Sequence, residues 1–419
     1  MKRMNNDFSV VVNEKMLIVA IDIGFTEHWA YFRAPNGREV RPFSFCTLRS
    51  DFEELWRKIR TFQRESGLES VVVGFESTGP YAEPLIHFLR EKGVRLVQVN
   101  PMHTKHLKEL TGNSPNKTDR KDPYVIADII ALQHGLSVGV PQGRAAELRR
   151  LTQARERAMT DMNGKINQLG QLVFVVFPEF YSIMKKTVSK SALFLFKHYP
   201  LPEALGAVKP ATLAQQLRCI SRGHLGRERA CALIEAARCS VGITQGVAGI
   251  TVEIRHLVDH IEQMRQYIAE LETLMDECLQ HIPCSQNLLS IRGVGVITIA
   301  GLIGEVGDFT SFRTFKELEK LAGLNLYEIS SGAHEGRRHI SKRGRPLMRK
   351  LLYCATLNTV RTNGIMYHPY HRLLDSGMPK MKAVVAIARK LLRLIYALVR
   401  DNTMFDGAHC SKTSLKNVA

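Results

Sequence analysis

The sequence predicts an α/β domain, a long helical arm and a mainly helical C-terminal domain, in that order along the chain. Apolar runs rich in β-branched residues alternate with helical patterns in the first third. A 3-4 apolar repeat of the coiled-coil type follows, and the last third is helical again and rich in arginine and lysine. At 419 residues the chain has room for two or three domains. We expect their boundaries at 16–143, 144–284 and 285–400, with a polar tail at 401–419.

The expected α/β domain begins with strands and continues with strands and helices in alternation. The predicted strands occupy 16–23, 28–33, 40–46, 70–75 and 94–100. The predicted helices occupy 50–65 and 81–92, because apolar residues recur there at helical spacing. Strands followed by strand–helix alternation is the element order of a ribonuclease-H-like domain, which carries acidic residues on its first strand, its fourth strand and a late helix.

Four acidic residues occupy those places. Asp22 ends the first apolar run, and Glu76 ends the run Val71-Val72-Val73-Gly74-Phe75. Asp119 and Asp122 are three residues apart, so they share a face if this stretch forms a helical turn. Converging carboxylates repel one another unless a divalent cation neutralises them, and Mg²⁺ or Mn²⁺ is the usual choice at phosphate chemistry. These four acids are therefore the predicted metal and catalytic site.

Simpler roles for the acids stay open at this point. Asp22 could cap a helix or stand in a surface turn, and Glu76 could cap the helix that follows it. Asp119 and Asp122 could pair with the lysine and arginine residues beside them on a solvated face.

The composition favours a polyanionic partner. The chain has 58 Lys and Arg against 40 Asp and Glu, a net charge of +18, which favours nucleic acid over a membrane surface. The 8 cysteines are scattered without metal-ligand spacing, so we expect reduced thiols and no zinc site. The polar start does not resemble a signal peptide, and no run of 18 apolar residues is present, so we expect a cytoplasmic protein and no membrane partner.

Two stretches of the arm repeat apolar residues at 3-4 spacing. The first extends from Leu148 to Leu172, and the more regular second one extends from Ile254 to Cys278. This seam predicts self-association as a dimer or tetramer, and helix packing within one chain is the alternative. The stretch 174–249 between them is less regular and contains several prolines, so we expect an elaboration of the arm without predicting a task for it.

The C-terminal region contains two features that suit phosphate binding. Gly293-Val294-Gly295 separates two helical patterns, as in helix–hairpin–helix modules that offer backbone N–H groups to DNA, although a plain turn between helices is the alternative. A stretch without acidic residues follows at 337–350. The basic residues expected to bind nucleic acid there are Arg337, Arg338, Lys342, Arg343, Arg345 and Arg349.

Several short motifs together resemble the DEDD transposases of the one-ten/eleven-eleven group of insertion sequences, relatives of the Piv-type DNA invertases. The matching motifs are Ala20-Ile21-Asp22-Ile23-Gly24, Gly74-Phe75-Glu76-Ser77-Thr78-Gly79, Asn100-Pro101, Lys117-Thr118-Asp119-Arg120-Lys121-Asp122, Gly293-Val294-Gly295, Ser330-Ser331-Gly332 and Ile340-Ser341-Lys342-Arg343-Gly344. They lie in the family's order and near both ends of the chain. The stretch 174–249 departs from the family, since it is longer than a plain coiled-coil arm.

This resemblance implies a RuvC-like acidic domain and a C-terminal transposase domain that form a composite active site. The family's acids map onto Asp22, Glu76, Asp119 and Asp122, and its serine nucleophile maps onto Ser331, with Ser330 as the neighbouring alternative. From the residues alone, both serines are ordinary turn residues before Gly332. The resemblance further implies a covalent phosphoserine intermediate, double-stranded DNA at the element ends and target, a structured guide RNA, and a bacterial protein associated with the nucleoid.

Three other functions compete with this interpretation. A RuvC-like nuclease or junction resolvase would use the same acids with water as the nucleophile. The run Asp22-Ile23-Gly24-Phe25-Thr26 also resembles the first phosphate loop of actin-like and sugar-kinase ATPases, but that loop normally has glycine where Phe25 stands, and a second loop is not evident. A non-catalytic nucleic-acid-binding protein with a decayed site is disfavoured because all four acids are present.

Overall fold

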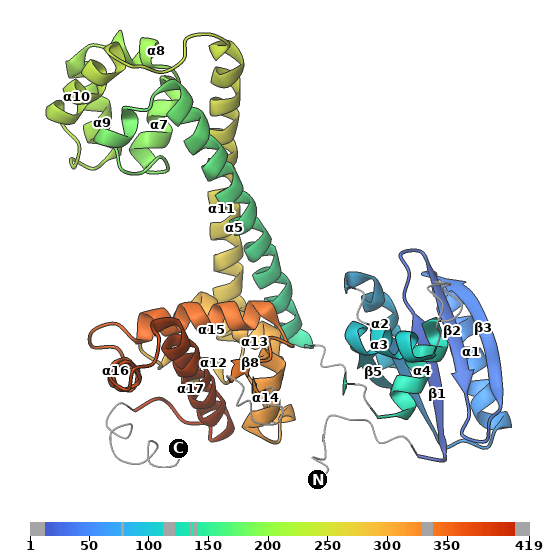
Figure 1. Cartoon of the computed structure of the whole chain (residues 1–419). Coiled ribbons are helices and arrows are strands. Elements are labelled where there is room, and N and C mark those ends of the chain that lie inside the picture. Colours follow the sequence, from blue (N-terminus) through green and yellow to red (C-terminus); the bar gives the residue numbers. More distant parts are fainter. Residues whose placement is uncertain are drawn as a thin grey trace. The chain divides into compact units, whose positions relative to one another are not determined.

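The computed structural model describes residues 13–76, 79–111, 122–133, 136–137, 141–328 and 338–406. The chain divides into two compact units, Met1–Val140 and Pro141–Ala419 (Figure 1). The end of the first unit lies three residues before the predicted boundary at 143. The predicted boundary at 284 does not separate units, because the arm and the C-terminal helices belong to one unit. Among the described helices, none combines the length and the apolar character that a membrane crossing requires.

The first unit is built on one mixed sheet. Its strands are β1 (Met16–Asp22), β2 (Glu27–Arg33), β3 (Glu39–Cys46), β4 (Ser70–Glu76), β5 (Arg95–Val99) and β6 (Leu136–Ser137), in the order β3-β2-β1-β4-β5-β6. β1, β4 and β5 are parallel, whereas β2 and β3 continue the sheet as antiparallel neighbours of β1. This strand order is that of the ribonuclease-H-like fold, so the predicted fold class is confirmed.

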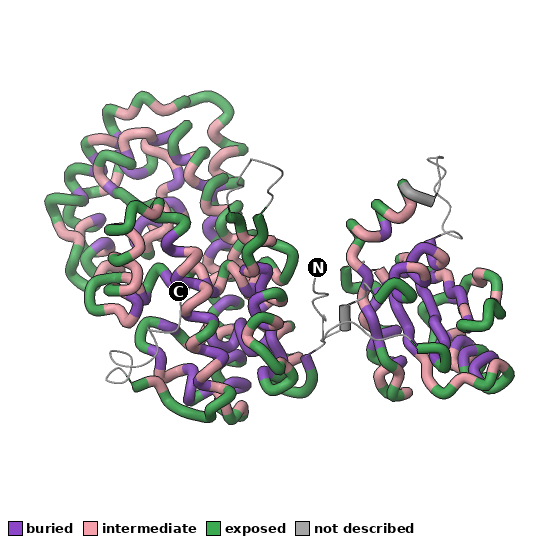
Figure 2. The backbone as a smooth tube through the Cα atoms, turned by 60° about the horizontal axis from the view of Figure 1, so that its bottom comes forward, coloured by how far each residue is buried: buried purple, intermediate pink, exposed green. Residues whose placement is uncertain are grey.

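Helices cover both faces of this sheet. The helices are α1 (Arg49–Glu65), the 3-10 turn η1 (Gly79–Ala82), α2 (Glu83–Glu91), α3 (Pro101–Thr111) and α4 (Asp122–Ala131). α1 and α2 share one apolar core with every second residue of β1, and α4 shares another core with the residues in between. Buried residues accordingly run along the central strands in Figure 2.

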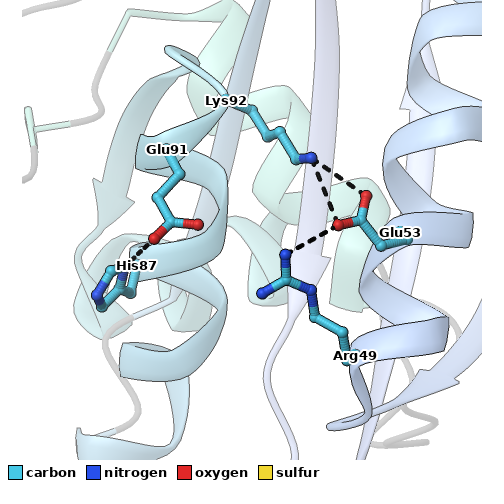
Figure 3. A network of polar contacts seen from close by, with 5 residues as sticks. All are labelled: Arg49, Glu53, His87, Glu91 and Lys92. Atoms are coloured by element: carbon cyan, nitrogen blue, oxygen red, sulfur yellow. Dashed lines mark hydrogen bonds and ion pairs between the residues drawn. The ribbon is translucent and has the colours of Figure 1, made fainter.

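A surface network joins α1 to the end of α2. The Lys92 Nζ lies 3.2 Å from a Glu53 oxygen, and an Arg49 nitrogen lies 3.2 Å from the same carboxylate (Figure 3). His87 and Glu91 pair along α2 in the same view. These side chains are partly exposed, so each pair contributes at most about 1 kcal/mol, and the apolar core beneath them holds the helices.

Two long helices form the arm of the second unit. α5 (Gly143–Val176) and α11 (Val247–Gln280) lie side by side and run in opposite directions (Figure 1). The apolar 3-4 positions line their contact, and Arg155 of α5 pairs with Glu272 of α11 at 2.6 Å.

The stretch 174–249 forms a small helical lobe at one end of the arm. Its helices are α6 (Phe180–Ile183), α7 (Lys190–His198), α8 (Pro202–Gly206), α9 (Pro210–Ile220) and α10 (Arg227–Arg238). Their apolar side chains form one core with Leu169 and Val173 of α5 and with Ile254 and Ile261 of α11.

The predicted seam is therefore buried within one chain. Ile254, Leu257, Ile261, Ile268 and Leu271 are at most 7% exposed, because α5 and the lobe cover them. The prediction that these side chains mediate self-association is wrong. They are buried by packing within the chain, which was the alternative. The sequence shows that a helix has an apolar seam, but it does not show which helix covers it.

The C-terminal helices pack around the other end of the arm. Their elements are α12 (Ser285–Leu289), α13 (Val296–Val306), η2 (Phe309–Ser311), α14 (Phe315–Ala322), β7 (Leu326–Tyr327), β8 (His339–Ile340), α15 (Pro346–Thr359), α16 (Tyr367–Asp375) and α17 (Lys380–Arg400). Leu148 of α5 and Met275 of α11 belong to the same core as α13, α15 and α17. This shared core explains why the arm and the C-terminal region form one unit.

Candidate active site

Two of the predicted acids end adjacent parallel strands. Asp22 is the last residue of β1, and Glu76 is the last residue of β4. The strands pair in the register Ala20↔Gly74 and Ile21↔Phe75, so the next step of the register places Asp22 beside Glu76. Neighbouring strands are about 4.8 Å apart, which brings the two carboxylates within reach of one cation.

The same two acids face one side of the sheet. Side chains alternate along a strand, so Asp22 lies on the face of Ile18 and Ala20, which pack against α4. Glu76 lies on the face of Gly74. A Cβ at Gly74 would lie 2.2 Å from Ile130 Cδ1, so the glycine lets α4 approach the sheet closely on the face that carries the acids.

The third described acid begins the helix on that face. Asp122 is the first residue of α4 and is followed by Pro123, a residue that suits the first turn of a helix. A carboxylate at a helix N-terminus is stabilised by the backbone dipoles, so this position suits an acidic residue. Asp122 is 9% exposed, unlike the solvated acid of the simpler interpretation.

Helix α3 contacts two of the acids. It begins with Asn100-Pro101, where the Asn100 side chain accepts a hydrogen bond from the Met102 N–H at 2.9 Å. The Thr104 hydroxyl lies 2.9 Å from Glu76 Oε2, and the Lys108 Nζ lies 2.7 Å from Asp122 Oδ2. Neither residue is among those predicted from sequence, although both lie at i, i+4 spacing just after a helix start.

Carboxylate oxygens are the ligands that Mg²⁺ and Mn²⁺ prefer, so the chemistry of this donor set suits either ion. Within the described part of the chain, no three acidic, histidine or cysteine residues already form a cluster that could hold a metal ion. Asp122 is instead engaged with Lys108, and Glu76 with Thr104. Asp22, Glu76 and Asp122, the three described acids, thus lie on one face of the sheet without being assembled around a common point.

Several predicted site residues lie outside the described residues. These are Asp119, Ser330, Ser331 and Arg337. The stretch that holds the two serines connects β7 to β8, which pair in antiparallel fashion through Leu326↔Ile340 and Tyr327↔His339.

Backbone hydrogen bonds hold the residues directly after β8 against the end of α14. The Lys342 N–H donates to the Gly323 carbonyl at 3.0 Å, and the Arg345 N–H donates to the Leu321 carbonyl at 2.8 Å. A Cβ at Gly344 would lie 2.4 Å from the Leu321 oxygen, so only glycine fits this approach. The chain directly after β8 is therefore held against the end of α14.

The structure separates the basic residues into two groups. Arg345 turns inward, where its Nη1 lies 3.6 Å from Glu305 Oε2 and its side chain is 19% exposed. Burial, and then the nearby Arg149, lower the pKa of Arg345 to about 10, against the effect of Glu305. Arg349 donates to the Ala322 carbonyl at 3.0 Å, and burial lowers its pKa. These two guanidinium groups, which we expected at phosphates, are engaged within the domain.

The other described basic residues are exposed. Lys342 and Arg343 lie on the surface just after β8. Arg338 is exposed too, and pairs with Glu328 at 2.9 Å across the base of the β7–β8 connection. Of the basic residues predicted to bind nucleic acid in this segment, these three are the described ones that face solvent.

The Gly-x-Gly motif forms the expected turn between two helices. Gly293 adopts a φ of +90°, which glycine reaches without strain, and Gly295 immediately precedes α13. No side chain caps the N-terminus of α13. Its first N–H groups therefore receive no side-chain cap, which both the helix–hairpin–helix interpretation and a plain turn between helices allow.

Comparison with known proteins gives two family matches. A transposase model of the DEDD IS110 type matches residues 19–178, and the model of the IS116/IS110/IS902 transposase family matches residues 285–371. The first match includes the sheet, its acids and the start of the arm, whereas the second includes the Gly-x-Gly turn, the serines and the basic segment. Together they span more than half of the chain.

Individual relatives agree with these matches. The chain is 27% identical to the insertion element IS900 uncharacterized 42 kDa protein of Mycobacterium paratuberculosis, over 77% of this chain and 81% of that protein. It is 23% identical to the insertion element IS110 uncharacterized 43.6 kDa protein of Streptomyces coelicolor, over 93% and 96%. It is 28% identical to a probable family 20 transposase of Pseudomonas aeruginosa, over 36% and 46%.

A solved structure, T. thermophilus RuvC in complex with Holliday junction substrate, matches with 15% identity and a TM-score of 0.21, over 29% of this chain and 99% of that chain. This similarity is too weak to support the fold assignment, which rests on the strand order. The acids at the ends of β1 and β4, the order of the motifs and both family matches agree. The chain therefore belongs to the IS116/IS110/IS902 family of transposases, enzymes that cut and rejoin DNA.

Proposed function

We propose that this transposase cuts and rejoins DNA through a covalent phosphoserine, formed by Ser331 with the help of a divalent metal site of Asp22, Glu76, Asp119 and Asp122. One observation carries the metal site: Asp22 and Glu76 end adjacent parallel strands and face the same side of the sheet. Asp122 begins the helix that covers this side, and α3 contacts both Glu76 and Asp122.

The serine step accounts for both cutting and rejoining. The Ser331 Oγ would form a bond to the scissile phosphorus while the bond from phosphorus to one deoxyribose oxygen breaks, and that oxygen leaves as a hydroxyl after taking up a proton. In rejoining, a DNA hydroxyl attacks the phosphoserine and the serine leaves, so the energy of the phosphodiester bond is kept. A bound Mg²⁺ or Mn²⁺ supplies Lewis acidity, which favours the serine alkoxide and offsets charge on the phosphate.

The chain's own residues have separate tasks in this proposal. The four acids hold the cation, and Lys342 and Arg343 neutralise phosphate charge next to the serine-bearing connection. The N–H groups after Gly295 bind a backbone phosphate of duplex DNA. Because the acids lie in the first unit and the serines in the second, the chemistry needs residues of both units.

A structured guide RNA and assembly into a dimer or tetramer are part of the proposal through the family resemblance. The net charge of +18 fits more than one nucleic-acid partner. The same family resemblance implies a bacterial protein associated with the nucleoid.

The test is an assay for a protein–DNA adduct. The full-length protein is incubated with its element-end DNA and Mg²⁺, with and without guide RNA, and run on denaturing gels. We expect an adduct that Ser331→Ala and Asp22→Ala each abolish, while Ser330→Ala retains it. An adduct lost only in Ser330→Ala assigns the nucleophile to the neighbour. Nicked DNA without any adduct would favour the RuvC-like hydrolytic alternative, in which water attacks, and would refute the phosphoserine.

A further inference from the structure

Helix α3 presents two polar side chains to the acids from one of its faces. Thr104 and Lys108 are one helical turn apart, about 6 Å along the axis. Thr104 reaches Glu76 at the end of β4, and Lys108 reaches Asp122 at the start of α4. A single helix therefore contacts two acids that come from different elements of the fold.

Thr104 restrains the Glu76 carboxylate. The residue is 2% exposed, so its hydroxyl has no alternative partner in bulk water. The hydroxyl hydrogen is shared between Glu76 Oε2, at 2.9 Å, and the Pro101 carbonyl oxygen, at 2.8 Å. A hydrogen bond to Glu76 Oε2 restrains that oxygen and leaves the other oxygen for a cation. Such outer contacts typically alter metal affinity by about 10–100-fold.

Lys108 has the opposite effect, because it hinders metal binding at Asp122. Its ammonium group lies 2.7 Å from Asp122 Oδ2, and the carboxylate side chain is 12% exposed. The pair neutralises an acid that is largely shielded from water. An ammonium at this distance occupies one of the directions from which a metal ion would be bound, so Lys108 must release Asp122 before that carboxylate can ligate fully.

We propose that α3 sets the cation affinity of the site with two side chains of opposite effect. Thr104 positions Glu76 for ligation, whereas Lys108 competes with the cation for Asp122. Lys108 is 35% exposed, so it can swing into solvent when a cation arrives. This inference rests on the proposed metal-dependent function.

The experiment measures Mn²⁺ affinity of the full-length protein by calorimetry and by the electron paramagnetic resonance signal of free Mn²⁺. Thr104→Val removes the hydroxyl at nearly constant volume, and we expect about tenfold weaker binding. Lys108→Met removes the competing charge at similar length, and we expect about fivefold tighter binding, the scale of a partly exposed ion pair. Thr104→Ser and Lys108→Arg should stay within about twofold of the parent protein, since each keeps the interacting group.

A matched control separates the local contact from general electrostatics. Lys105→Met removes the same charge from the same helix, but Lys105 is exposed. It should change Mn²⁺ affinity by less than about twofold, because an exposed charge is screened by salt. Circular dichroism of every variant checks that the fold is retained.

The outcomes distinguish this inference from the proposed function. If the parent protein binds no Mn²⁺, or Asp22→Ala binds it equally well, the proposed metal site itself fails. If Asp22→Ala removes binding but Lys108→Met weakens it or matches Lys105→Met, Lys108 does not compete. If Thr104→Val binds as tightly as the parent protein, Thr104 does not position Glu76. Opposite shifts in Thr104→Val and Lys108→Met support the proposal.

Discussion

Gly304 lies where α13 crosses α5, and its replacement by alanine offers a direct test of the second unit's packing. A Cβ at this position would lie 2.7 Å from the Arg149 nitrogen, 2.8 Å from the Arg149 Cα and 2.9 Å from the Leu148 carbonyl carbon. All three are backbone atoms, so no side chain can turn away to make room. The helices would have to separate by about 0.8 Å to restore a contact distance of about 3.5 Å.

The expected cost follows from two opposing effects. Alanine is the better helix former by about 1 kcal/mol, so Gly304→Ala would stabilise the protein if the crossing had room. Overpacking costs about 1–3 kcal/mol and sometimes more, and a gap of about 0.5–1 Å forfeits a quarter to a half of the dispersion energy of the contacts it opens. We therefore expect a net loss of about 2 kcal/mol in the free energy of unfolding. The melting temperature should fall by roughly 4–8 °C.

The assay is thermal and urea unfolding followed by circular dichroism, with Gly164→Ala as the control. Gly164 lies in the middle of α5, and a Cβ there would meet no atom within 4 Å. The control should stabilise the protein by about 0.5–1 kcal/mol, because only the helix preference changes. If Gly304→Ala raised the melting temperature like the control, the close crossing of α13 and α5 would be refuted.

Two further predictions concern the basic segment and the apolar seam of α11. Arg345→Ala should destabilise the fold by about 3 kcal/mol, because it leaves the 5% exposed Glu305 carboxylate without this partner, whereas Arg343→Ala should leave the melting temperature unchanged and lower DNA affinity with a shallower salt dependence. Equal effects of both variants on stability would contradict this division. Ile261→Asp combined with Ile268→Asp should lower the melting temperature, at a cost of roughly 2–5 kcal/mol per buried charge, because these side chains are 0% and 7% exposed within one chain. If light scattering showed a dissociated oligomer while the melting temperature stayed unchanged, the seam would be an interface between chains.

The fold of the first unit was predictable from sequence because its signals are local. The run from Met16 to Asp22 is buried along almost its whole length, and such a run reads as a central strand. The ends of β1 and β4 are marked by acids directly after apolar residues, so the positions of Asp22 and Glu76 followed from the strand ends. That they share a face required the register as well, which only the structure gives.

For the arm, the sequence predicted the helices but not the surface that covers them. Its 3-4 repeat correctly predicts long helices, since the repeat is a property of one helix. The covering surface comes from α5, about a hundred residues earlier in the chain, and from the lobe at 174–249, whose short helices have weak periodicity. Two chains or one chain could satisfy the same seam equally well, so the sequence left the choice open.

Charged residues carry the least local information, because a guanidinium or ammonium group takes its role from its acceptor. The basic segment gave no sign that Arg345 faces Glu305 on α13 while Arg343 faces solvent two residues earlier. Lys108 resembled any lysine on an amphipathic helix until α4 placed Asp122 beside it. Both pairs join different segments of the chain, and both shield a carboxylate from water. The difference lies in what else those carboxylates can bind. Glu305 is enclosed by its helix packing, whereas Asp122 begins the helix on the face of the sheet that carries Asp22 and Glu76, so only the second pair has a reason to open.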